Sequence, residues 1–339
     1  MSKVISLKVE EFLVKSKDNL IVDVRSPAEF EHAHIPGAVN FYLFDNDERK
    51  EIGTLYKQHG REKAMMRGLE LYGNNMKRIV EQVQQSGHKK LFVHCWRGGM
   101  RSGVVSWMLS LFGHHVSVLQ GGYKMYRRFV LDSFQQQYSF VIVGGKTGSA
   151  KTKVIHQLQS QDEAVIDLEG LANHRGSAFG AIGLPAPPTQ EQFENNLAKQ
   201  LLQLQSKKIF LEDESQRIGW VNIPNNIWLQ MRDSKVLYLD IPFEERLKYL
   251  VSTYGLFPVE ELKAASERIR KRLGGLDLKN TLQYLNDGNF IEAFRILLKY
   301  YDKVYQHATD NRKALNVLTI SCTDVDEIKN AEAIIQQKI

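Results

Sequence analysis

The chain has few cysteines and no long apolar run, and both absences narrow its function. Its 339 residues include only two cysteines, Cys95 and Cys322, which lie far apart and lack the spacing of a metal-binding pair. A disulfide framework is therefore not expected. No apolar run is long enough to span a bilayer, and residues 1–6 lack the apolar stretch of a signal peptide. We expect a cytoplasmic protein in a reducing compartment, with no membrane partner.

The composition is that of a globular protein large enough for two domains. Lys and Arg total 45 against 39 acidic residues, which gives a net charge of +6 and permits a polyanionic partner without requiring one. Some basic clusters contain aromatic residues such as Tyr123 and Tyr126, a combination that suits RNA. Solvated helix faces explain the same clusters equally well. The clusters are Lys89/Lys90, Lys124/Arg127/Arg128 and Arg268/Arg270/Lys271/Arg272.

Cys95 stands at the end of an apolar run, residues 91–93, and is followed by two glycines and two arginines. This pattern predicts a strand, a tight loop and a helix that begins at Ser102. The backbone amides of such a loop form an anion site, where the loop dipoles and guanidiniums favour a reactive thiolate. A buried structural cysteine is the alternative, but it leaves the arginines and glycines unexplained. The expected anion-binding loop comprises Trp96, Arg97, Gly98, Gly99, Met100 and Arg101.

A cysteine followed by five residues and an arginine serves two chemistries. Dual-specificity phosphatases use it for phosphoryl transfer, and rhodaneses use a similar loop to transfer sulfur or selenium. Residues 20–40 and 118–123 resemble the rhodanese family, so the first domain, residues 1–130, is expected to be rhodanese-like. The loop contains no aspartate that could act as a general acid, which weakens the phosphatase alternative without excluding it.

A second anion site is predicted between an apolar strand, residues 140–143, and a helix, residues 154–158. The intervening segment matches G-x-x-x-x-G-K-[ST], with alanine in place of the last glycine; it comprises Gly145, Lys146, Thr147, Gly148, Ser149, Ala150, Lys151 and Thr152. Loop amides would cradle phosphates, Lys151 would reach the outer phosphate, and Thr152 would hold Mg²⁺. The Ala150 methyl group is harmless if its φ is negative but narrows the space beside the phosphate. Phosphate binding is expected, and NTP hydrolysis stays open.

Acidic and basic residues farther along the chain support a kinase-like P-loop domain over residues 138–339. The apolar strand that begins at Lys208 ends at Glu212 and Asp213, either of which could orient a metal ion. Strands that alternate with helices predict a doubly wound parallel sheet. Arg268, Arg270 and Arg272 are expected on one basic helix, either as a lid that screens a leaving diphosphate or as a solvated face.

Residues 95–102, 173–180 and 212–219, together with the fusion of the two domains, resemble the tRNA 2-selenouridine synthase family over nearly the full length. The resemblance implies that the wobble 2-thiouridine of tRNAs for Lys, Glu and Gln is alkylated with geranyl diphosphate. Selenophosphate then delivers selenium and the S-geranyl group leaves. Carried onto this sequence, Cys95 handles selenium and residues 145–152 bind the diphosphate. A selenophosphate-producing enzyme is a candidate partner, and no tightly bound cofactor is implied.

The candidate residues on the substrate side are His174, Arg175, Ser177, Glu212, Asp213, Arg217, Arg268 and Arg272, with Mg²⁺ expected at Thr152 and Asp213. Two other functions stay open. One is an enzyme of another class, either an ATP-dependent rhodanese-type sulfur transferase or a phosphatase-like enzyme. The other is a degenerate rhodanese regulator that binds tRNA or nucleotide, against which the intact Cys95 and its flanking arginines argue. Cys322 is expected to be a small core residue.

Overall fold

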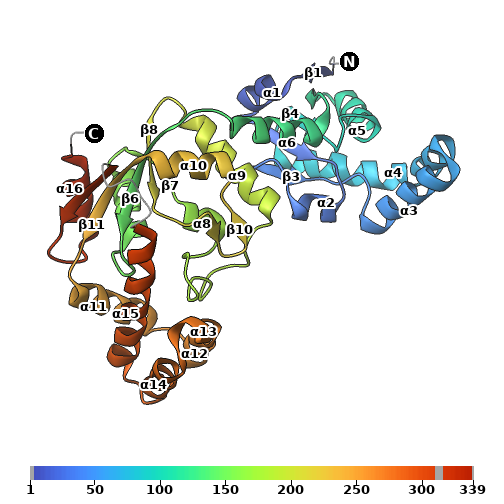
Figure 1. Ribbon diagram of the computed structural model, residues 1–339. Helices are drawn as coiled ribbons and strands as arrows, with labels where there is room; N and C mark the ends of the chain where they lie inside the picture. The colour runs from blue at the N-terminus through green and yellow to red at the C-terminus, as the bar shows by residue number, and fades with distance from the viewer. Residues whose placement is uncertain (1–3, 310–315, 338–339) are drawn as a thin grey trace. The chain divides into compact units, whose positions relative to one another are not determined.

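The computed structural model describes residues 4–309 and 316–337 and divides into two compact units, residues 1–133 and 134–339 (Figure 1). Each unit contains a five-stranded sheet whose neighbouring strands are all parallel. Parallel neighbours need crossover connections, and helices supply them here. The predicted α/β class, with one parallel sheet in each half of the chain, is confirmed.

The first unit has the strand order β1-β5-β4-β2-β3. Its strands are β1 (Ile5–Leu7), β2 (Leu20–Asp23), β3 (Ala38–Asn40), β4 (Lys90–His94) and β5 (His115–Leu119). Its helices are α1 (Val9–Lys15), α2 (Pro27–His32), α3 (Asn46–His59), α4 (Arg61–Ser86), α5 (Met100–Leu111) and α6 (Gly122–Ser133).

Side chains along β4 alternate between two covered faces of this sheet. Leu91 and Val93 pack in a core that includes Ile79 of α4 and Leu109 of α5. Phe92 faces the other way, where its ring meets the edge of Phe12 of α1 at a centroid distance of 5.3 Å. Both faces of the sheet are therefore buried, which is why these strands are continuous apolar runs.

The second unit has the strand order β12-β11-β6-β8-β7. The strands are β6 (Ser139–Gly145), β7 (Ala164–Ile166), β8 (Lys208–Glu212), β11 (Lys235–Asp240) and β12 (Val317–Ser321). A short antiparallel pair is formed by β9 (Arg217–Ile218) and β10 (Val221–Asn222). The helices connected directly to this sheet are α7 (Lys151–Ser160), α8 (Leu168–Ala172), α9 (Gln190–Gln203), α10 (Asn225–Asp233) and α16 (Glu327–Ile335).

A helical cluster follows β11 and is coloured orange to red in Figure 1. Its members are α11 (Phe243–Tyr254), α12 (Val259–Arg268), α13 (Arg270–Leu273), α14 (Gly275–Asn286) and α15 (Phe290–Thr309). These helices share a core of their own, which includes Leu262 and Phe294. The same core takes in Phe179 and Ile182 from the segment after α8. The cluster therefore holds that segment in place.

Several boundaries differ from the sequence-based expectation. Helix α5 begins at Met100 rather than Ser102, so Arg101 lies in its first turn. Helix α6 continues to Ser133, beyond residue 130, where the first domain was expected to end. The basic helix expected to carry Arg268 and Arg272 is divided at Ile269, because this side chain is buried in the helical cluster and the chain turns around it.

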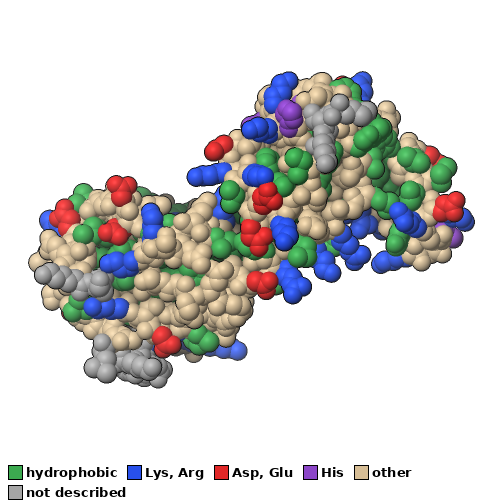
Figure 2. Space-filling model, turned by 90° about the horizontal axis from the view of Figure 1, so that it is seen from above, with side chains coloured by type: hydrophobic (Ala, Val, Ile, Leu, Met, Phe, Trp, Pro, Cys, Tyr) green, Lys and Arg blue, Asp and Glu red, His purple; other side chains and the backbone are tan. Residues whose placement is uncertain are grey.

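Among the residues that the structure describes, no helix is long and apolar enough to cross a membrane. Figure 2 shows Lys and Arg side chains spread over the visible face of both units, with Asp and Glu among them.

Candidate active site

Cys95 directly follows β4, on the face that carries Leu91 and Val93, and only 3% of it is exposed. Its Sγ atom lies 3.2 Å from Oγ of Ser102, which is in the first turn of α5. The same hydroxyl group is 3.2 Å from the carbonyl oxygen of Gly99. A hydroxyl group beside the sulfur can donate to a thiolate, so Ser102 belongs to the immediate surroundings of the nucleophile.

The loop after Cys95 rests on the glycine turn that begins α6. The amide of Tyr123 donates to the Cys95 carbonyl at 2.8 Å. Gly122 has a φ of 62°, and a Cβ there would lie 2.4 Å from both the Cys95 carbonyl oxygen and the Gly98 nitrogen. Gly98 also has a positive φ, 63°, and faces the same turn. Only glycine permits this backbone approach, which accounts for the glycines in both segments.

Arg101 does not stand free beside the sulfur. It donates to both carboxylate oxygens of Glu29 at 2.7 and 3.3 Å, and so ties α5 to α2. Burial alone would raise the pKa of Glu29, but the hydrogen bonds from Arg101 and from the Ser26 amide outweigh burial and lower it. Burial would lower the Arg101 pKa, but the hydrogen bonds to Glu29 and the charge of Glu29 outweigh burial and raise it. Arg97, by contrast, is exposed.

A buried ion pair forms the floor of this site. Arg25 is 1% exposed, donates to both oxygens of Asp23, and lies with its guanidinium carbon 3.9 Å from the ring centroid of Tyr123. His94 lies 3.8 Å from Asp23, and both side chains are fully buried. Burial is the main cause that lowers the His94 pKa, so this ring is neutral at physiological pH.

The second loop, residues 145–152, has the backbone of a phosphate cradle. Gly145 and Gly148 have φ values of 152° and 84°. Ala150 also has a positive φ, 53°, so the condition under which its methyl group would be harmless is not met. The Nζ atom of Lys151 donates to the Gly145 carbonyl at 3.1 Å. Arg246 supports the loop from α11, because its guanidinium donates to the Thr147 carbonyl at 3.0 Å and pairs with Asp302.

Thr152 faces a pair of carboxyl groups, the half-buried Glu169 and the buried Glu214. Its hydroxyl donates to Glu169 of α8 at 2.8 Å, and a hydrogen bond joins Glu169 to Glu214. Burial raises the pKa of both groups, and the charge of Lys151 opposes the rise in each case. The loop therefore meets two carboxyl groups whose charged forms are disfavoured by burial.

Glu212 is fully buried at the end of β8. One of its oxygens accepts the Leu168 amide at 3.1 Å, and the other has no hydrogen-bond partner among the residues that the structure describes. Burial and the charges of Asp167, Glu169 and Glu214 raise its pKa well above the ordinary value. Asp213 lies beyond the end of this strand, where its amide donates to the Val143 carbonyl at 3.0 Å.

The segment after α8 comes together with the segment after β8. A Cβ on Gly176 would lie 2.6 Å from Glu214 and 3.2 Å from Glu169, so this glycine rests against the carboxyl pair. The ring of His174 contacts Gly219 and meets Trp220 edge-on at 5.6 Å. The P-loop segment, residues 145–152, therefore converges with residues 173–180 and 212–219, two of the segments that carry the family resemblance.

The candidate substrate-side residues have different surroundings in the structure. His174 is buried, and burial is the main cause that lowers its pKa. Arg175 and Arg268 donate to the carbonyls of Ile182 and Ala178, which fixes the segment after α8. Ser177 accepts the Phe179 amide at 3.2 Å in the same segment.

The other two arginines have other surroundings. Arg217 is exposed and donates to the Gly219 carbonyl. Arg272 lines a separate cavity of the helical cluster together with Arg295 and Lys299. The expectation that Arg268, Arg270 and Arg272 lie on one basic helix is therefore wrong, because Ile269 separates Arg268, the last residue of α12, from Arg270 and Arg272 in α13.

Comparison with known proteins gives consistent matches for both units. The family described as "tRNA 2-selenouridine synthase AAA domain" matches residues 138–334, and the rhodanese-like domain family matches residues 8–128. The tRNA 2-selenouridine synthase of Nitrosomonas europaea is 31% identical, over 87% of this chain and 90% of that protein. The corresponding protein of Shewanella frigidimarina is 35% identical, over 86% and 89%. The chain belongs to the tRNA 2-selenouridine synthase family.

Solved structures similar to this family member include a rhodanese-related protein from Thermoplasma volcanium, with 16% identity and a TM-score of 0.24, over 37% of this chain and 92% of that chain. Membership in the synthase family confirms the predicted resemblance and shows that the chain is an enzyme with a rhodanese and an AAA domain.

The structure places five residues at the two loops of this 2-selenouridine synthase family member that the sequence did not indicate as site residues. They are Glu29, Ser102, Glu169, Glu214 and Arg246. Glu29 had a local signal, because Ser26 and Glu29 form a helix capping box. No local pattern in the sequence indicates that Glu29 pairs with Arg101, which lies far along the chain.

Proposed function

We propose that this chain converts the wobble 2-thiouridine of tRNA into 2-selenouridine in two steps at two separate loops. In the first step, the thiouridine sulfur attacks carbon 1 of geranyl diphosphate; the S–C bond forms, the C–O bond breaks and diphosphate leaves. In the second step, the Cys95 thiolate attacks the phosphorus of selenophosphate; the S–P bond forms, the Se–P bond breaks and selenide leaves. The selenide attacks carbon 2 of the base, the C–S bond breaks, and the geranyl thiolate leaves and takes up a proton. Water then cleaves the S–P bond, which releases phosphate and restores the Cys95 thiol.

The observation that carries this proposal is the presence of two anion-binding loops, of which only one has a nucleophile. Alkylation turns a poor leaving group into one that selenium can displace, so an enzyme of this kind needs a site for each anion. We assign selenophosphate to the loop of Cys95, with Arg97 and Arg101 beside it. We assign geranyl diphosphate to residues 145–152, where Lys151 and the loop amides would stabilise the departing diphosphate.

The residues around Thr152 fit Mg²⁺, because the hydroxyl faces Glu169 and the nearby Glu212 has an oxygen without a partner. A bound Mg²⁺ would supply positive charge against the diphosphate. We place its protein ligands at Thr152 and the carboxyl groups of this cluster, with Asp213 as the expected alternative. The proposed tRNAs are those for Lys, Glu and Gln, in the cytoplasm, with a selenophosphate-producing enzyme as the supplier.

The test separates the two steps by mass spectrometry of nucleosides from digested tRNA. Cys95→Ser replaces a readily ionised thiol with a hydroxyl group that stays protonated. It should abolish selenium incorporation while S-geranyl-2-thiouridine accumulates. Lys151→Ala removes a charge-assisted phosphate contact and should leave unmodified 2-thiouridine, and tRNA that is already geranylated should bypass this defect.

Two variants serve as controls. Cys322→Ser changes the other cysteine, and Lys153→Ala removes an exposed lysine from the same helix as Lys151; both should retain both steps. If Cys95→Ser blocks geranylation as severely as selenation, one shared site is the better explanation. Tight ATP binding without binding of geranyl diphosphate, measured by calorimetry, would instead favour an ATP-dependent sulfur transferase.

A further inference from the structure

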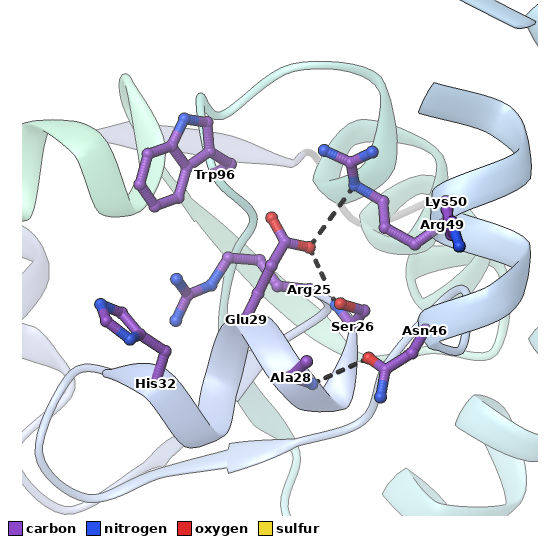
Figure 3. Close-up of a pocket in the computed structure, with 9 residues that line it drawn as sticks. All are labelled: Arg25, Ser26, Ala28, Glu29, His32, Asn46, Arg49, Lys50 and Trp96. Carbon is purple, nitrogen blue, oxygen red and sulfur yellow. Dashed lines mark hydrogen bonds and ion pairs between the residues drawn. The ribbon is translucent and has the colours of Figure 1, made fainter. Parts of the chain in front are cut away.

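A cavity lies beside the Cys95 loop, and neither geranylation nor selenation has been assigned to it. It has a volume of about 520 Å³ and is lined by Arg25, Ser26, Ala28, Glu29, His32, Asn46, Arg49, Lys50 and Trp96. Figure 3 shows Trp96 and His32 on one side, Arg49 and Lys50 on the other, and the Glu29 carboxylate between them. The volume lies within the range of about 300–1,000 Å³ that is typical of small-molecule sites.

The walls of this cavity combine an aromatic face with surplus positive charge. Trp96 follows the nucleophile directly, and its indole is 38% exposed. Arg49 and Lys50 supply two positive charges against the single carboxylate of Glu29, because the charge of Arg25 is already paired with Asp23. Arg101, outside the lining, also pairs with Glu29, and Arg49 lies 3.6 Å from it. The carboxylate is thus already neutralised, and charge on Arg49 and Lys50 is left for an anion.

The position of the indole is fixed by what lies beneath it. Its ring lies 5.7 Å from that of Tyr123, which is fully buried, and 5.9 Å from the guanidinium carbon of Arg25. The backbone carbonyl of Trp96 accepts the Lys124 amide at 3.0 Å. One face of the indole is therefore supported by the protein, and the exposed part borders the cavity.

We propose that this cavity receives one unpaired nucleotide of an RNA, with its base against Trp96 and its phosphates on Arg49 and Lys50. Unpaired bases are held by aromatic stacking and their backbone by Lys and Arg, and this lining offers both. A selenophosphate ion would use the charges but would leave the indole without a partner. The assignment rests on the proposed function, because it places the reacting base one residue from Cys95.

The test is a thermodynamic cycle with the full chain and two stem-loop RNAs that differ only at the wobble position, one with S-geranyl-2-thiouridine, the base that reacts at the Cys95 loop, and one abasic. Base stacking on an aromatic side chain is worth about 1–3 kcal/mol, so Trp96→Ala should weaken binding of the first RNA by about 5- to 150-fold and leave binding of the abasic RNA unchanged. Trp96→Phe keeps a ring and should restore most of the affinity. Arg49→Ala should weaken both RNAs equally and lower the slope of log affinity against log salt by about one.

Trp107→Ala is the matched control, because Trp107 is a 51% exposed tryptophan of the same unit that does not line the cavity. It should bind both RNAs like the unchanged protein. Equal losses for both RNAs on Trp96→Ala, or no loss, would overturn the nucleotide pocket and leave the proposed function standing. Failure of the unchanged protein to bind either RNA would overturn both.

Discussion

At the scale of single residues, the buried carboxyl groups near Thr152 make stability depend on pH. The Glu212 pKa is raised by burial and by three neighbouring acids, so the folded state holds a proton that the unfolded state releases. Above the ordinary pKa, the folded state binds more protons than the unfolded one, and stability falls as pH rises through the folded-state pKa. Each unit of such a shift is worth about 1.4 kcal/mol.

Glu212→Gln should therefore stabilise the protein at pH 8.5 and change stability little at pH 5, as measured by urea unfolding at both pH values. The variant keeps an oxygen for the Leu168 amide and cannot ionise. Glu261→Gln, at an exposed position of the same unit, should show no such dependence. A destabilised variant at pH 8.5 would mean that the charged carboxylate is satisfied in the folded protein, for example by a cation.

At the scale of elements, the Cys95 loop depends on close backbone packing between the start of α5 and the start of α6. Gly122→Ala places a methyl group against the Cys95 carbonyl and the Gly98 nitrogen at a positive φ. The loop has to move, so we expect a loss of about 1–3 kcal/mol of stability together with loss of selenium incorporation.

Gly103→Ala provides the contrast, since its Cβ would meet nothing within 4 Å and the residue lies inside α5. It should stabilise the first unit by about 0.5–1 kcal/mol and retain activity. Thermal unfolding and the nucleoside assay measure both effects. Normal selenium incorporation by a folded Gly122→Ala protein would contradict the packing argument.

At the scale of the whole molecule, the surplus of basic residues is expected to give tRNA binding a strong salt dependence. The structure excludes Tyr123 and Tyr126 from the expected tRNA-binding surface, because both side chains are buried and cannot stack on bases. Arg128 remains exposed and Arg127 half-buried on the same helix. Reversing the charge of both arginines should flatten the slope of log affinity against log salt by about one for each phosphate that the variant no longer binds.

Reversing Lys15 and Lys17 changes the net charge of the first unit equally and should leave that slope nearly unchanged. Filter-binding or fluorescence titrations at several salt concentrations give the slopes. If both double variants give the same slope of log affinity against log salt, Arg127 and Arg128 of α6 do not contact tRNA phosphates.

The strands and the two loops could be predicted from the sequence, because each of them depends on a short run of adjacent residues. Apolar runs buried on both faces predict parallel strands, the spacing of glycines and lysine predicts the loop at residues 145–152, and Cys95 at a strand end predicts the nucleophile's loop. These signals are local because a strand, a turn and a helix start each depend on a few adjacent residues.

The contacts between side chains that are far apart in the sequence became known from the folded chain alone. Glu29 pairs with Arg101, and Glu169 meets both Thr152 and Glu214, across separations that no periodic pattern encodes. The backbone at Ala150 adopts a positive φ, which composition cannot reveal because the conformation is imposed by the surrounding loop. Tyr123 looked like an RNA contact in the sequence, and it is buried because α6 packs its aromatic face on the sheet. Burial and pairing are properties of the assembled fold, because they depend on segments that are distant in the sequence. The partners of the charged residues at both loops therefore become visible only in the tertiary structure.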